Sequence, residues 1–473
     1  MKSTELLSAF KMLRPKITKV TADSREVMAG TVFVAVRGVS QDGHQFIKKA
    51  HESGAIMIIG EEPCKENIGY IQVKDSKKAL GDLAAEFYGH PSQYMKMIGV
   101  TGTSGKTTTT YLIESILIAA GHKVGVLGTI NFRIGETVLP STHTTPGAVE
   151  LQELLARMRK AGCTAVVMEV SSHALKQKRT AAVSFDGVVF TNLTPEHLDF
   201  HPDMDDYFES KAILFKEQLR ESKRAGKNPF ATANADDPYG QRLIQETGAK
   251  PFQLTGQITT SLTGIHGSYQ GVKFESSLIG GFNASNILAA MSVTLGIGIG
   301  PKEVQEGVEN LKNVPGRLES IKQAGRTVLV DYAHKPDALE KVLKVLSELK
   351  GQHHLYTVFG CGGDRDRSKR PVMGKHAVKL SDYVVITSDN PRGENPQAIV
   401  DEILVGTAGY QNFSVELDRK KAIIAAIERS KPGDLILVAG KGHEDYQIVQ
   451  GAKIHFDDRE IAREALQNLD TRF

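Results

Sequence analysis

The chain has 473 residues, of which 40% are hydrophobic and 24% are charged; this is an ordinary globular composition, and the length suggests about three domains. The formal net charge is only +3 and no run of Lys and Arg exceeds a few residues, so we expect no nucleic-acid partner. Three widely spaced cysteines exclude a disulfide framework, and we expect a cytoplasmic protein without membrane insertion, because we find neither a leader-like amino terminus nor an apolar run near the ~18 residues of a membrane span.

Residues 1–95 form the first predicted block, in which short β-branched runs alternate with helical patterns. The predicted strands are 31–36 and 55–59, and the predicted helices are 45–54 and 77–89. The stretch GHPSQY at 89–94 predicts a linker to the second block, because it is rich in turn-forming residues.

Residues 96–315 and 316–473 form the second and third blocks, with the boundary in the string NVPGRLES. Nearly continuous apolar runs predict buried parallel strands in both blocks. These runs are 123–130, 164–172, 186–193, 327–334, 354–363, 382–390 and 434–442. Helical patterns lie between them, including 337–350 and 418–430. Because strands and helices alternate throughout, the sequence predicts an α/β fold with parallel sheets.

The second block opens with a strand, a glycine-rich loop and a helical pattern, in the string MIGVTGTSGKTTTT. Gly102 and Gly105 would let the backbone approach a phosphate, Lys106 would reach its oxygens, and Thr107 could hold Mg²⁺. The strict phosphate-loop pattern needs glycine where this chain has Val100, so this is a variant loop. The alternative is a glycine-rich turn with a surface lysine. The strand before the loop and the helix after it favour a site for a nucleoside triphosphate and magnesium.

Phosphoryl transfer also needs metal ligands, and in open parallel sheets such groups come from the carboxyl ends of strands. Glu169 ends the run AVVME, and His197 lies just past VVFTNL. Each residue alone could be a polar side chain at a loop entry. Together, in the block that carries the phosphate loop, they predict a metal-dependent nucleotide site.

Seven strings follow one another in a fixed order along the second and third blocks: TGTSGKTT (101–108), MEVSSHAL (168–175), TNLTPEHLDFH (191–201), YFESKAILF (207–215), FNASNILAA (282–290), VPGRLE (314–319) and DYAHKPDALE (331–340). In this order they resemble the Mur ligases, the amide-forming ATP enzymes of peptidoglycan synthesis. Residues 23–47 are similar to the nucleotide-sugar domain of one branch of that family. The segments 358–374, 389–396 and 439–447 point to the same branch, which adds the third residue of the stem peptide.

The resemblance implies three α/β domains and a monomer. Residues 1–95 would bind a UDP-sugar, 96–315 would be a central ATPase domain with a parallel sheet and a phosphate loop, and 316–473 would be a Rossmann-like domain that binds an amino acid. The implied substrates are ATP, UDP-MurNAc-L-Ala-D-Glu and meso-diaminopimelate, with Mg²⁺ as the metal.

The resemblance also assigns roles to positions of this chain. Lys106, Glu169, His197 and Lys211 would be catalytic, and the metal would be held by Thr107, Glu169, His197 and a carbamate on Lys211. A carbamate would turn that cation into an anionic oxygen ligand, which suits Mg²⁺. The implied ATP contacts are Gly102, Thr103, Ser104, Gly105, Lys106, Thr107, Thr108, Asn283, Asn286, Arg317 and Asp331. The implied UDP-sugar-peptide contacts are Ser24, Thr144, Thr145, Ser171, Gln177 and Arg179.

The string DNPR, from Asp389 to Arg392, matches the branch that takes meso-diaminopimelate. By resemblance the amino-acid pocket consists of Arg365, Asp389, Asn390, Arg392, Gly440 and Glu444. A guanidinium suits the far carboxylate of this substrate, and a carboxylate suits its far ammonium. The alternative for Arg392 is a surface loop residue paired with Glu394.

Two departures from the family pattern, Ser104 and Gly147, leave the choice of substrate open. One alternative is a related ligase that adds L-lysine or another amino acid, although the DNPR string favours diaminopimelate. A second alternative is a catalytically silent nucleotide-binding scaffold. Such a protein would be expected to have lost Lys106, Glu169, His197 or Lys211, and all four are present.

Overall fold

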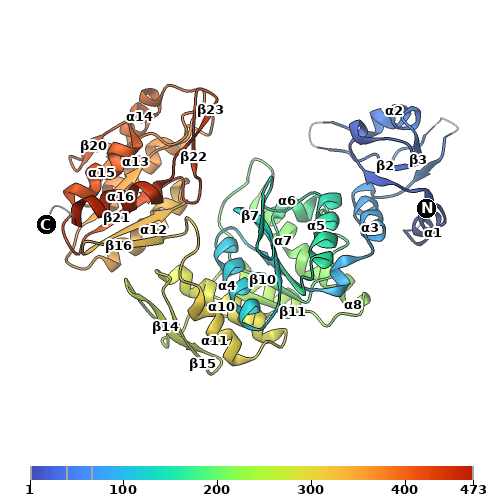
Figure 1. Cartoon of the computed structure of the whole chain (residues 1–473), viewed down its shortest axis with the longest axis horizontal. Coiled ribbons are helices and arrows are strands. Elements are labelled where there is room, and N and C mark those ends of the chain that lie inside the picture. Colours follow the sequence, from blue (N-terminus) through green and yellow to red (C-terminus); the bar gives the residue numbers. More distant parts are fainter. Residues whose placement is uncertain (1–2, 39–40, 65–67, 471–473) are drawn as a thin grey trace. The chain divides into compact units, whose positions relative to one another are not determined.

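The computed structural model describes residues 3–38, 41–64 and 68–470, and the chain folds as two compact units (Figure 1). Unit 1 consists of Met1–Thr255, Tyr269–Lys273 and Ser285–Val308, and unit 2 of Gly256–Ser268, Phe274–Ala284 and Glu309–Phe473. Both are built from sheets with mostly parallel strands, which confirms the predicted α/β class. The finer division at residues 95 and 315 stays a prediction.

The amino-terminal part of unit 1 is a parallel sheet of four strands in the order β1-β2-β3-β4. The strands are β1 (Lys19–Thr21), β2 (Thr31–Val34), β3 (Ala55–Gly60) and β4 (Tyr70–Gln72), and the helices are α1 (Ser3–Leu13), α2 (Ile47–Glu52) and α3 (Ser76–Tyr88). Every residue of β2 is buried, and apolar clusters lie on both faces of the sheet. This agrees with the uninterrupted apolar run at 31–36.

The larger sheet of unit 1 has eight strands in the order β12-β11-β10-β5-β9-β6-β7-β8. They are β5 (Lys96–Thr101), β6 (Val124–Leu127), β7 (Asn131–Ile134), β8 (Thr137–Pro140), β9 (Ala165–Glu169), β10 (Gly187–Phe190), β11 (Phe230–Asn234) and β12 (Lys250–Phe252). All pairs are parallel except β6 with β7 and β7 with β8. After β5 the chain runs to β6 on one side, and after β9 it returns to β10 on the other. Such a reversal opens a crevice at the carboxyl ends of the strands, where ligands bind in folds of this kind.

Helices connect and cover this sheet. They are α4 (Lys106–Ala119), α5 (Ala148–Lys160), α6 (Ser172–Lys176), α7 (Met204–Ile213), α8 (Leu219–Arg224), α9 (Pro238–Thr247), α10 (Gly281–Gly296) and α11 (Pro301–Asn310), with a π-helical segment at Leu214–Gln218 between α7 and α8. Helix α7 begins at an Asp203 cap, whose carboxylate accepts the backbone N–H of Asp206. The cap fixes the start of the helix that carries Lys211.

The stretch predicted as a linker is a packed turn. Gly89 ends α3 in the left-handed conformation (φ 73°), and a 3₁₀ turn at Pro91–Tyr94 follows. Ser92 is buried, and its hydroxyl accepts the N–H of Ser184 at 3.2 Å. The Nζ of Lys227 donates to the Ser92 carbonyl at 2.8 Å. The connection between the two sheets of unit 1 is therefore anchored, which turn-forming composition alone does not reveal.

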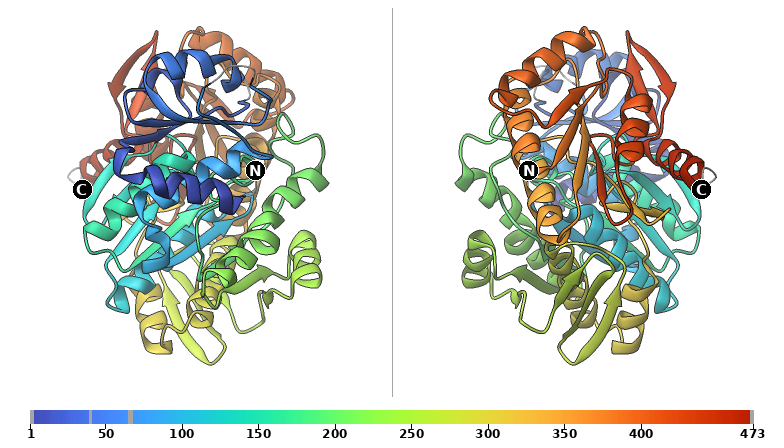
Figure 2. Two further views of the ribbon diagram at one scale, coloured as in Figure 1. Left: turned by 90° about the vertical axis from the view of Figure 1, so that its right-hand side faces the viewer. Right: turned by 90° about the vertical axis from the view of Figure 1, so that its left-hand side faces the viewer.

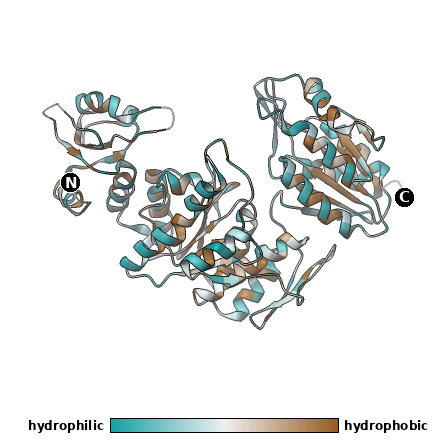
Figure 3. Ribbon diagram, turned by 180° about the vertical axis from the view of Figure 1, so that it is seen from behind, coloured by the Kyte–Doolittle hydropathy of each residue, from teal (hydrophilic) through white to brown (hydrophobic). Residues whose placement is uncertain are grey.

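Unit 2 contains a six-stranded sheet in the order β16-β17-β21-β18-β19-β20. Its strands are β16 (Glu319–Gln323), β17 (Arg326–Asp331), β18 (Leu355–Phe359), β19 (Tyr383–Ile386), β20 (Phe413–Val415) and β21 (Leu435–Ala439), all parallel except β16 with β17. Helices α12 (Pro336–Leu349), α13 (Lys369–Leu380) and α14 (Pro396–Leu404) pack on one face, and α15 (Arg419–Arg429) and α16 (Asp458–Asp470) on the other (Figure 2). The hydrophobic residues gather on the strands and the inner helix faces (Figure 3).

Two small sheets went unrecognised in the sequence: β13 (Thr259–Ser261), β14 (Gly264–Tyr269) and β15 (Val272–Ser276), and the hairpin of β22 (Tyr446–Val449) and β23 (Ala452–His455). The residues of β23 are exposed, so the hairpin has little of the apolar alternation that marks a strand. Among the described residues, no helix has both the length and the apolar character needed to cross a membrane.

A fully buried ion pair joins α15 and α16 in unit 2. Arg419, at the start of α15, donates from Nε and NH2 to the two carboxylate oxygens of Asp458, at the start of α16, both at 2.8 Å. Both side chains are fully buried, and Arg419 also donates to the carbonyl of Ala439 at 2.9 Å. A buried carboxylate that loses its partner is costly, because the interior solvates a charge poorly.

We therefore predict that Arg419→Ala lowers the free energy of unfolding by about 3–5 kcal/mol, because Asp458 is left buried and uncompensated. The neighbouring Lys420→Ala is the matched control, since Lys420 pairs with Glu464 on the surface, where the two side chains are 54% and 62% exposed. Such exposed pairs contribute about 0–1 kcal/mol. Denaturant titration of the full chain measures both variants, and equal effects would contradict the assignment.

Candidate functional site

The predicted phosphate loop lies between β5 and α4, at the carboxyl end of the eight-stranded sheet. Gly102 has φ 145° and Gly105 has φ 86°, which side chains rarely tolerate. A Cβ at Gly102 would collide with the hydroxyl of Thr191, and one at Gly105 with the amide oxygen of Asn286. Both glycines are therefore required by the local packing, and the loop presents its backbone at the start of α4, where anions bind.

Two lysines meet at one carbonyl of this loop. Lys106 donates from Nζ to the carbonyls of Gly102 and Thr103, both at 2.9 Å. Lys211, from α7, donates to the same Gly102 carbonyl at 2.9 Å. Lys211 is only 1% exposed, and burial, reinforced by the charge of Lys106, lowers the pKa of its amine well below the usual value. The chain thus places a lysine that readily becomes neutral beside the phosphate loop.

Side-chain oxygens that could serve as metal ligands lie at the same edge of the sheet. Thr107 donates from Oγ1 to Glu169 Oε1 at 3.0 Å. Thr129 donates to the same carboxylate twice, from its N–H to Oε1 and from its hydroxyl to Oε2, each at 3.0 Å. A hydroxyl and an oriented carboxylate beside a phosphate loop fit Mg²⁺, which prefers oxygen ligands.

His197 lies in the loop that follows β10, as predicted, with φ 58°. Its ring contacts that of His173 edge-on, with the ring centroids 4.8 Å apart, and its Nε2 lies 3.4 Å from Glu196 Oε1. Within the described ranges, no group of three or more His, Cys, Asp or Glu side chains is arranged to hold a metal. The predicted magnesium set is of another kind, since it combines a hydroxyl and a modified lysine with Glu169 and His197, and it stays a prediction.

Five of the six residues predicted to contact the UDP-sugar peptide form connected contacts near Glu169. Thr145 donates its hydroxyl to the Glu169 carbonyl at 2.9 Å and accepts the N–H of Ser171 at 3.1 Å. Arg179 donates to the Thr145 carbonyl at 3.0 Å and to the amide oxygen of Gln177 at 2.7 Å. The hydroxyl of the fifth residue, Thr144, is 3.1 Å from that of Thr129. The sixth, Ser24, lies in the turn after β1 of the four-stranded sheet.

Three of the residues predicted to contact ATP lie in unit 2. Asp331 ends β17 and is buried, and its two carboxylate oxygens accept the N–H groups of Leu318 and Ala333, both at 2.8 Å. Burial raises the pKa of Asp331, although Arg317 and these hydrogen bonds oppose the shift. The guanidinium of Arg317 lies 5.1 Å from the centre of the Tyr332 ring. Asn283 donates to the carbonyl of Ile279 at 2.9 Å.

The predicted amino-acid pocket in unit 2 contains a preassembled carboxylate. Glu444 Oε2 accepts Nδ2 of Asn390 at 2.9 Å and Nζ of Lys441 at 3.1 Å. Asn390 Oδ1 in turn accepts the N–H of Ile448 at 2.9 Å. Asp389 and Gly440 lie beside each other, since a Cβ on Gly440 would contact the Asp389 carboxylate. These contacts fix the Glu444 carboxylate in the loop between β21 and β22.

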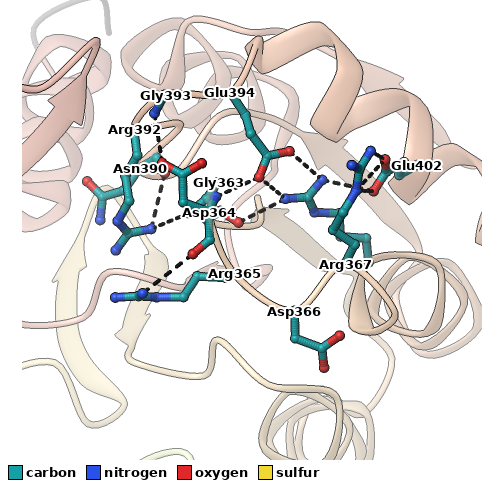
Figure 4. Close-up of polar contacts among 12 residues, drawn as sticks. Gly363, Asp364, Arg365, Asp366, Arg367, Asn390, Arg392, Gly393, Glu394 and Glu402 are labelled. Carbon is teal, nitrogen blue, oxygen red and sulfur yellow. Dashed lines mark hydrogen bonds and ion pairs between the residues drawn. The ribbon is translucent and has the colours of Figure 1, made fainter. Parts of the chain in front are cut away.

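Arg392 has a left-handed backbone (φ 53°). Its guanidinium is held through one nitrogen, NH1, which makes its hydrogen bonds to the protein. NH1 donates to the Gly363 carbonyl at 2.8 Å and lies 3.4 Å from the Asn390 carbonyl (Figure 4). Within the part of the chain that the structure describes, neither Nε nor NH2 of Arg392 donates to a protein acceptor, so one edge of the guanidinium can take a carboxylate. Glu394 pairs with Arg370 instead, which rules out the Arg392–Glu394 alternative. Arg365 is exposed and is 3.5 Å from the Asp364 carbonyl.

Three residues that hold the carboxylates of the candidate sites were not predicted from the sequence. Thr129 holds Glu169, Lys441 holds Glu444, and Arg370 holds Glu394. Lys441 and Arg370 lie inside strings that match the family, AGKGHEDYQ and VFGCGGDRDRSKRPVMG, which was the available signal. Thr129 follows a strand without any such mark.

Comparison with known proteins agrees with this arrangement. The family described as Mur ligase family, catalytic domain, matches residues 16–88, the Mur ligase middle domain matches residues 100–294, and the Mur ligase, glutamate ligase domain, matches residues 316–442. A protein of Geobacter metallireducens named UDP-N-acetylmuramoyl-L-alanyl-D-glutamate–2,6-diaminopimelate ligase is 44% identical over 97% of this chain and 95% of its own length. A protein of that name from Bacillus cereus is 41% identical over 96% of this chain and 94% of its own.

Solved structures show the same relationship. One with the name UDP-N-acetylmuramoyl-L-alanyl-D-glutamate–2,6-diaminopimelate ligase aligns with a TM-score of 0.71 and 31% identity, covering 96% of this chain and 95% of that one. The MurF ligase from Thermotoga maritima in complex with ADP has a TM-score of 0.59 at 20% identity over 97% and 99% of the two chains, and so shares the fold. Because Mur ligase domains match all three blocks in order and relatives reach 44% identity over nearly the full length, the chain belongs to the Mur ligase family.

Proposed function

We propose that this chain is an ATP-dependent ligase that joins meso-diaminopimelate to the γ-carboxylate of D-Glu in UDP-MurNAc-L-Ala-D-Glu, a step of peptidoglycan synthesis. The observation that carries the proposal is the meeting of Lys106, Lys211 and Glu169 around one phosphate loop, in a chain 44% identical to a ligase named for these substrates.

The reaction proceeds in two steps. The γ-carboxylate of the dipeptide attacks the γ-phosphate of ATP, which gives an acyl phosphate and ADP. The amine of diaminopimelate then attacks the acyl carbon, loses a proton and expels phosphate, which leaves the amide. Lys106 offsets the negative charge that develops on the transferring phosphoryl group.

Magnesium would be held by Thr107, Glu169, His197 and a carbamate on Lys211, and it would supply positive charge to the phosphate oxygens. Only a neutral amine adds to carbon dioxide, and the burial of Lys211 beside Lys106 favours the neutral form. The carbamate would also replace a repulsive pair of lysine charges by an attractive one.

The remaining site residues follow the same assignment. ATP would contact the loop residues 102–108 together with Asn283, Asn286, Arg317 and Asp331. The UDP-sugar peptide would contact Ser24, Thr144, Thr145, Ser171, Gln177 and Arg179. Diaminopimelate would be held at its far end by Arg392, Asn390 and Glu444, with Arg365, Asp389 and Gly440 around them.

The proposal is tested by incubating the purified full chain with UDP-MurNAc-L-Ala-D-Glu, ATP, Mg²⁺ and one amino acid at a time. We expect phosphate release and a product of the mass of the diaminopimelate adduct. Lys106→Ala is the control for the phosphate loop and should lose about 3 kcal/mol or more of transition-state stabilisation, the typical loss for such a group. Efficient addition of L-lysine, or no ligation at all, would overturn the assignment.

We predict that Lys211→Ala loses roughly a hundredfold or more of its turnover, because it removes a metal ligand and its charge. Short carboxylates such as acetate or formate should partly restore activity by supplying oxygen ligands. Lys106→Ala should not respond to them, and the surface variant Lys216→Ala should behave as wild type. Incorporation of isotope-labelled bicarbonate into the active wild type, followed by NMR, checks the modification directly, and an active enzyme without it would refute the role.

We predict that Arg392→Ala raises the KM for meso-diaminopimelate by roughly ten- to a hundredfold, because a charge-assisted pair contributes about 1.5–3 kcal/mol. The constants for ATP and the UDP-dipeptide should barely change. L-lysine should remain a poor substrate, since the variant creates no new contact for it. Steady-state kinetics with each substrate varied in turn decide the matter, and an unchanged diaminopimelate constant would remove Arg392 from the pocket.

A further inference from the structure

Arg370 lies at the first turn of α13, and its side chain is fully buried. It donates from NH2 to Glu394 Oε1 at 2.8 Å and from NH1 to Glu394 Oε2 at 2.9 Å, which is a two-pronged pair. NH1 also donates to Glu402 at 2.8 Å, and NH2 lies 3.3 Å from the Gly362 carbonyl. One guanidinium thus joins α13, α14 and the loop after β18.

Glu394, which Arg370 holds in place, is hydrogen-bonded to the loop after β18. Its Oε1 accepts the N–H of Asp364 at 2.6 Å, and the Asp364 carboxylate accepts the N–H of Gly393 at 3.0 Å (Figure 4). The segment 393–394 and the segment 362–364 are therefore joined by hydrogen bonds in both directions. The hydrogen bonds from Arg370 lower the pKa of Glu394 to about 2, so the carboxylate keeps its charge throughout the neutral range.

These two segments determine where the Arg392 guanidinium points. Gly363 accepts Arg392 NH1 through its carbonyl at 2.8 Å, and its own N–H donates to the Asn390 carbonyl at 2.9 Å. Arg392 itself has a left-handed backbone, which a non-glycine residue keeps only when its surroundings impose it. The acceptor of the guanidinium is thus fixed by contacts that lead back to Arg370. The backbone of Arg392 is held separately, because its N–H donates to the Ile448 carbonyl at 3.0 Å and its carbonyl accepts the N–H of Gln450 at 2.9 Å.

We propose that Arg370 is a positioning residue for the amino-acid substrate: acting through Glu394 and Asp364, it holds Arg392 in the orientation that receives the far carboxylate of diaminopimelate. The inference rests on the proposed function, because it concerns the selectivity of the same pocket. Arg370 does not touch the substrate, and its effect is confined to the geometry of Arg392.

Arg367 provides the contrast. It pairs with Glu402 from the other side, but its side chain is 65% exposed, and among the described residues it makes no hydrogen bond or ion pair with Glu394. A general loosening of α14 would follow from losing either arginine. A loss of substrate positioning would follow only from losing Arg370.

The test compares Arg370→Lys with Arg367→Ala in the full chain. Lysine keeps the charge but cannot reproduce the planar fork that meets both oxygens of Glu394. We expect the KM for meso-diaminopimelate to rise about tenfold in Arg370→Lys, because a small displacement of a positioning group is costly, while kcat and the KM for ATP stay within twofold. Arg367→Ala should leave all three constants unchanged. Glu394→Gln, which keeps the shape of the side chain, should reproduce the effect if Arg370→Lys folds poorly.

A double-mutant cycle separates positioning from structural damage. In an Arg392→Ala background, Arg370→Lys should cause no further rise in the diaminopimelate KM, since the group that it positions is gone. If Arg392→Ala raises this constant but Arg370→Lys and Glu394→Gln do not, the positioning role is wrong and the proposed function stands. Additive effects of Arg370→Lys and Arg392→Ala would also overturn it. If Arg392→Ala has no effect, the proposed pocket itself fails, and the role of Arg370 fails with it.

Discussion

The site in unit 1 depends on the crowding of two lysine side chains around the carbonyl of Gly102. Charges of the same sign repel strongly where water is excluded, so the protein must relieve the repulsion between Lys106 and Lys211. Loss of the Lys211 proton, which its lowered pKa favours, relieves this repulsion, and the proposed carbamate would turn it into an attraction. The arrangement requires that β5 and α7, which are far apart in the sequence, meet at one edge of the sheet, and the parallel order of β5, β9 and β10 brings them there.

In unit 2, the proposed amino-acid pocket holds ionic side chains in fixed positions, which would suit a substrate that carries charge at both ends. Glu444 and Arg392 each use part of their hydrogen-bonding capacity on protein partners, so each is oriented before the ligand arrives. Preorganisation of this kind lowers the conformational cost of binding. In the proposed pocket it would also allow discrimination, because an amino acid without the far carboxylate would leave Nε and NH2 of Arg392 without an anionic acceptor.

The central strands of both large sheets could be predicted from the sequence, because strands buried on both faces are continuous apolar runs, and the phosphate loop could be predicted from its glycines and Lys106. The outer strands β7, β8, β11, β12, β16 and β20 were not predicted, because they are only partly buried and lack such runs. The packed turn at 89–94 could not, since its anchors Ser184 and Lys227 come from distant segments. For the same reason the pairing of Arg370 with Glu394 was missed: the two residues are on different elements and either could pair on the surface. The left-handed backbone of Arg392 could not be predicted either, because tertiary contacts impose it and the residue is not a glycine.

The close fit of Gly102 against Thr191 restricts how this loop can evolve. Any side chain at position 102 collides with the Thr191 hydroxyl, and its Cβ would also lie 3.1 Å from the backbone of Asn192 at a φ of 145°, so a smaller residue at 191 alone would not make room for it. That hydroxyl also donates to the carbonyl of Ser104 at 2.7 Å, and shrinking it removes a second support of the loop. A change at either position therefore weakens the loop, and changing both together would still leave a side chain close to the Asn192 backbone at a φ that favours glycine.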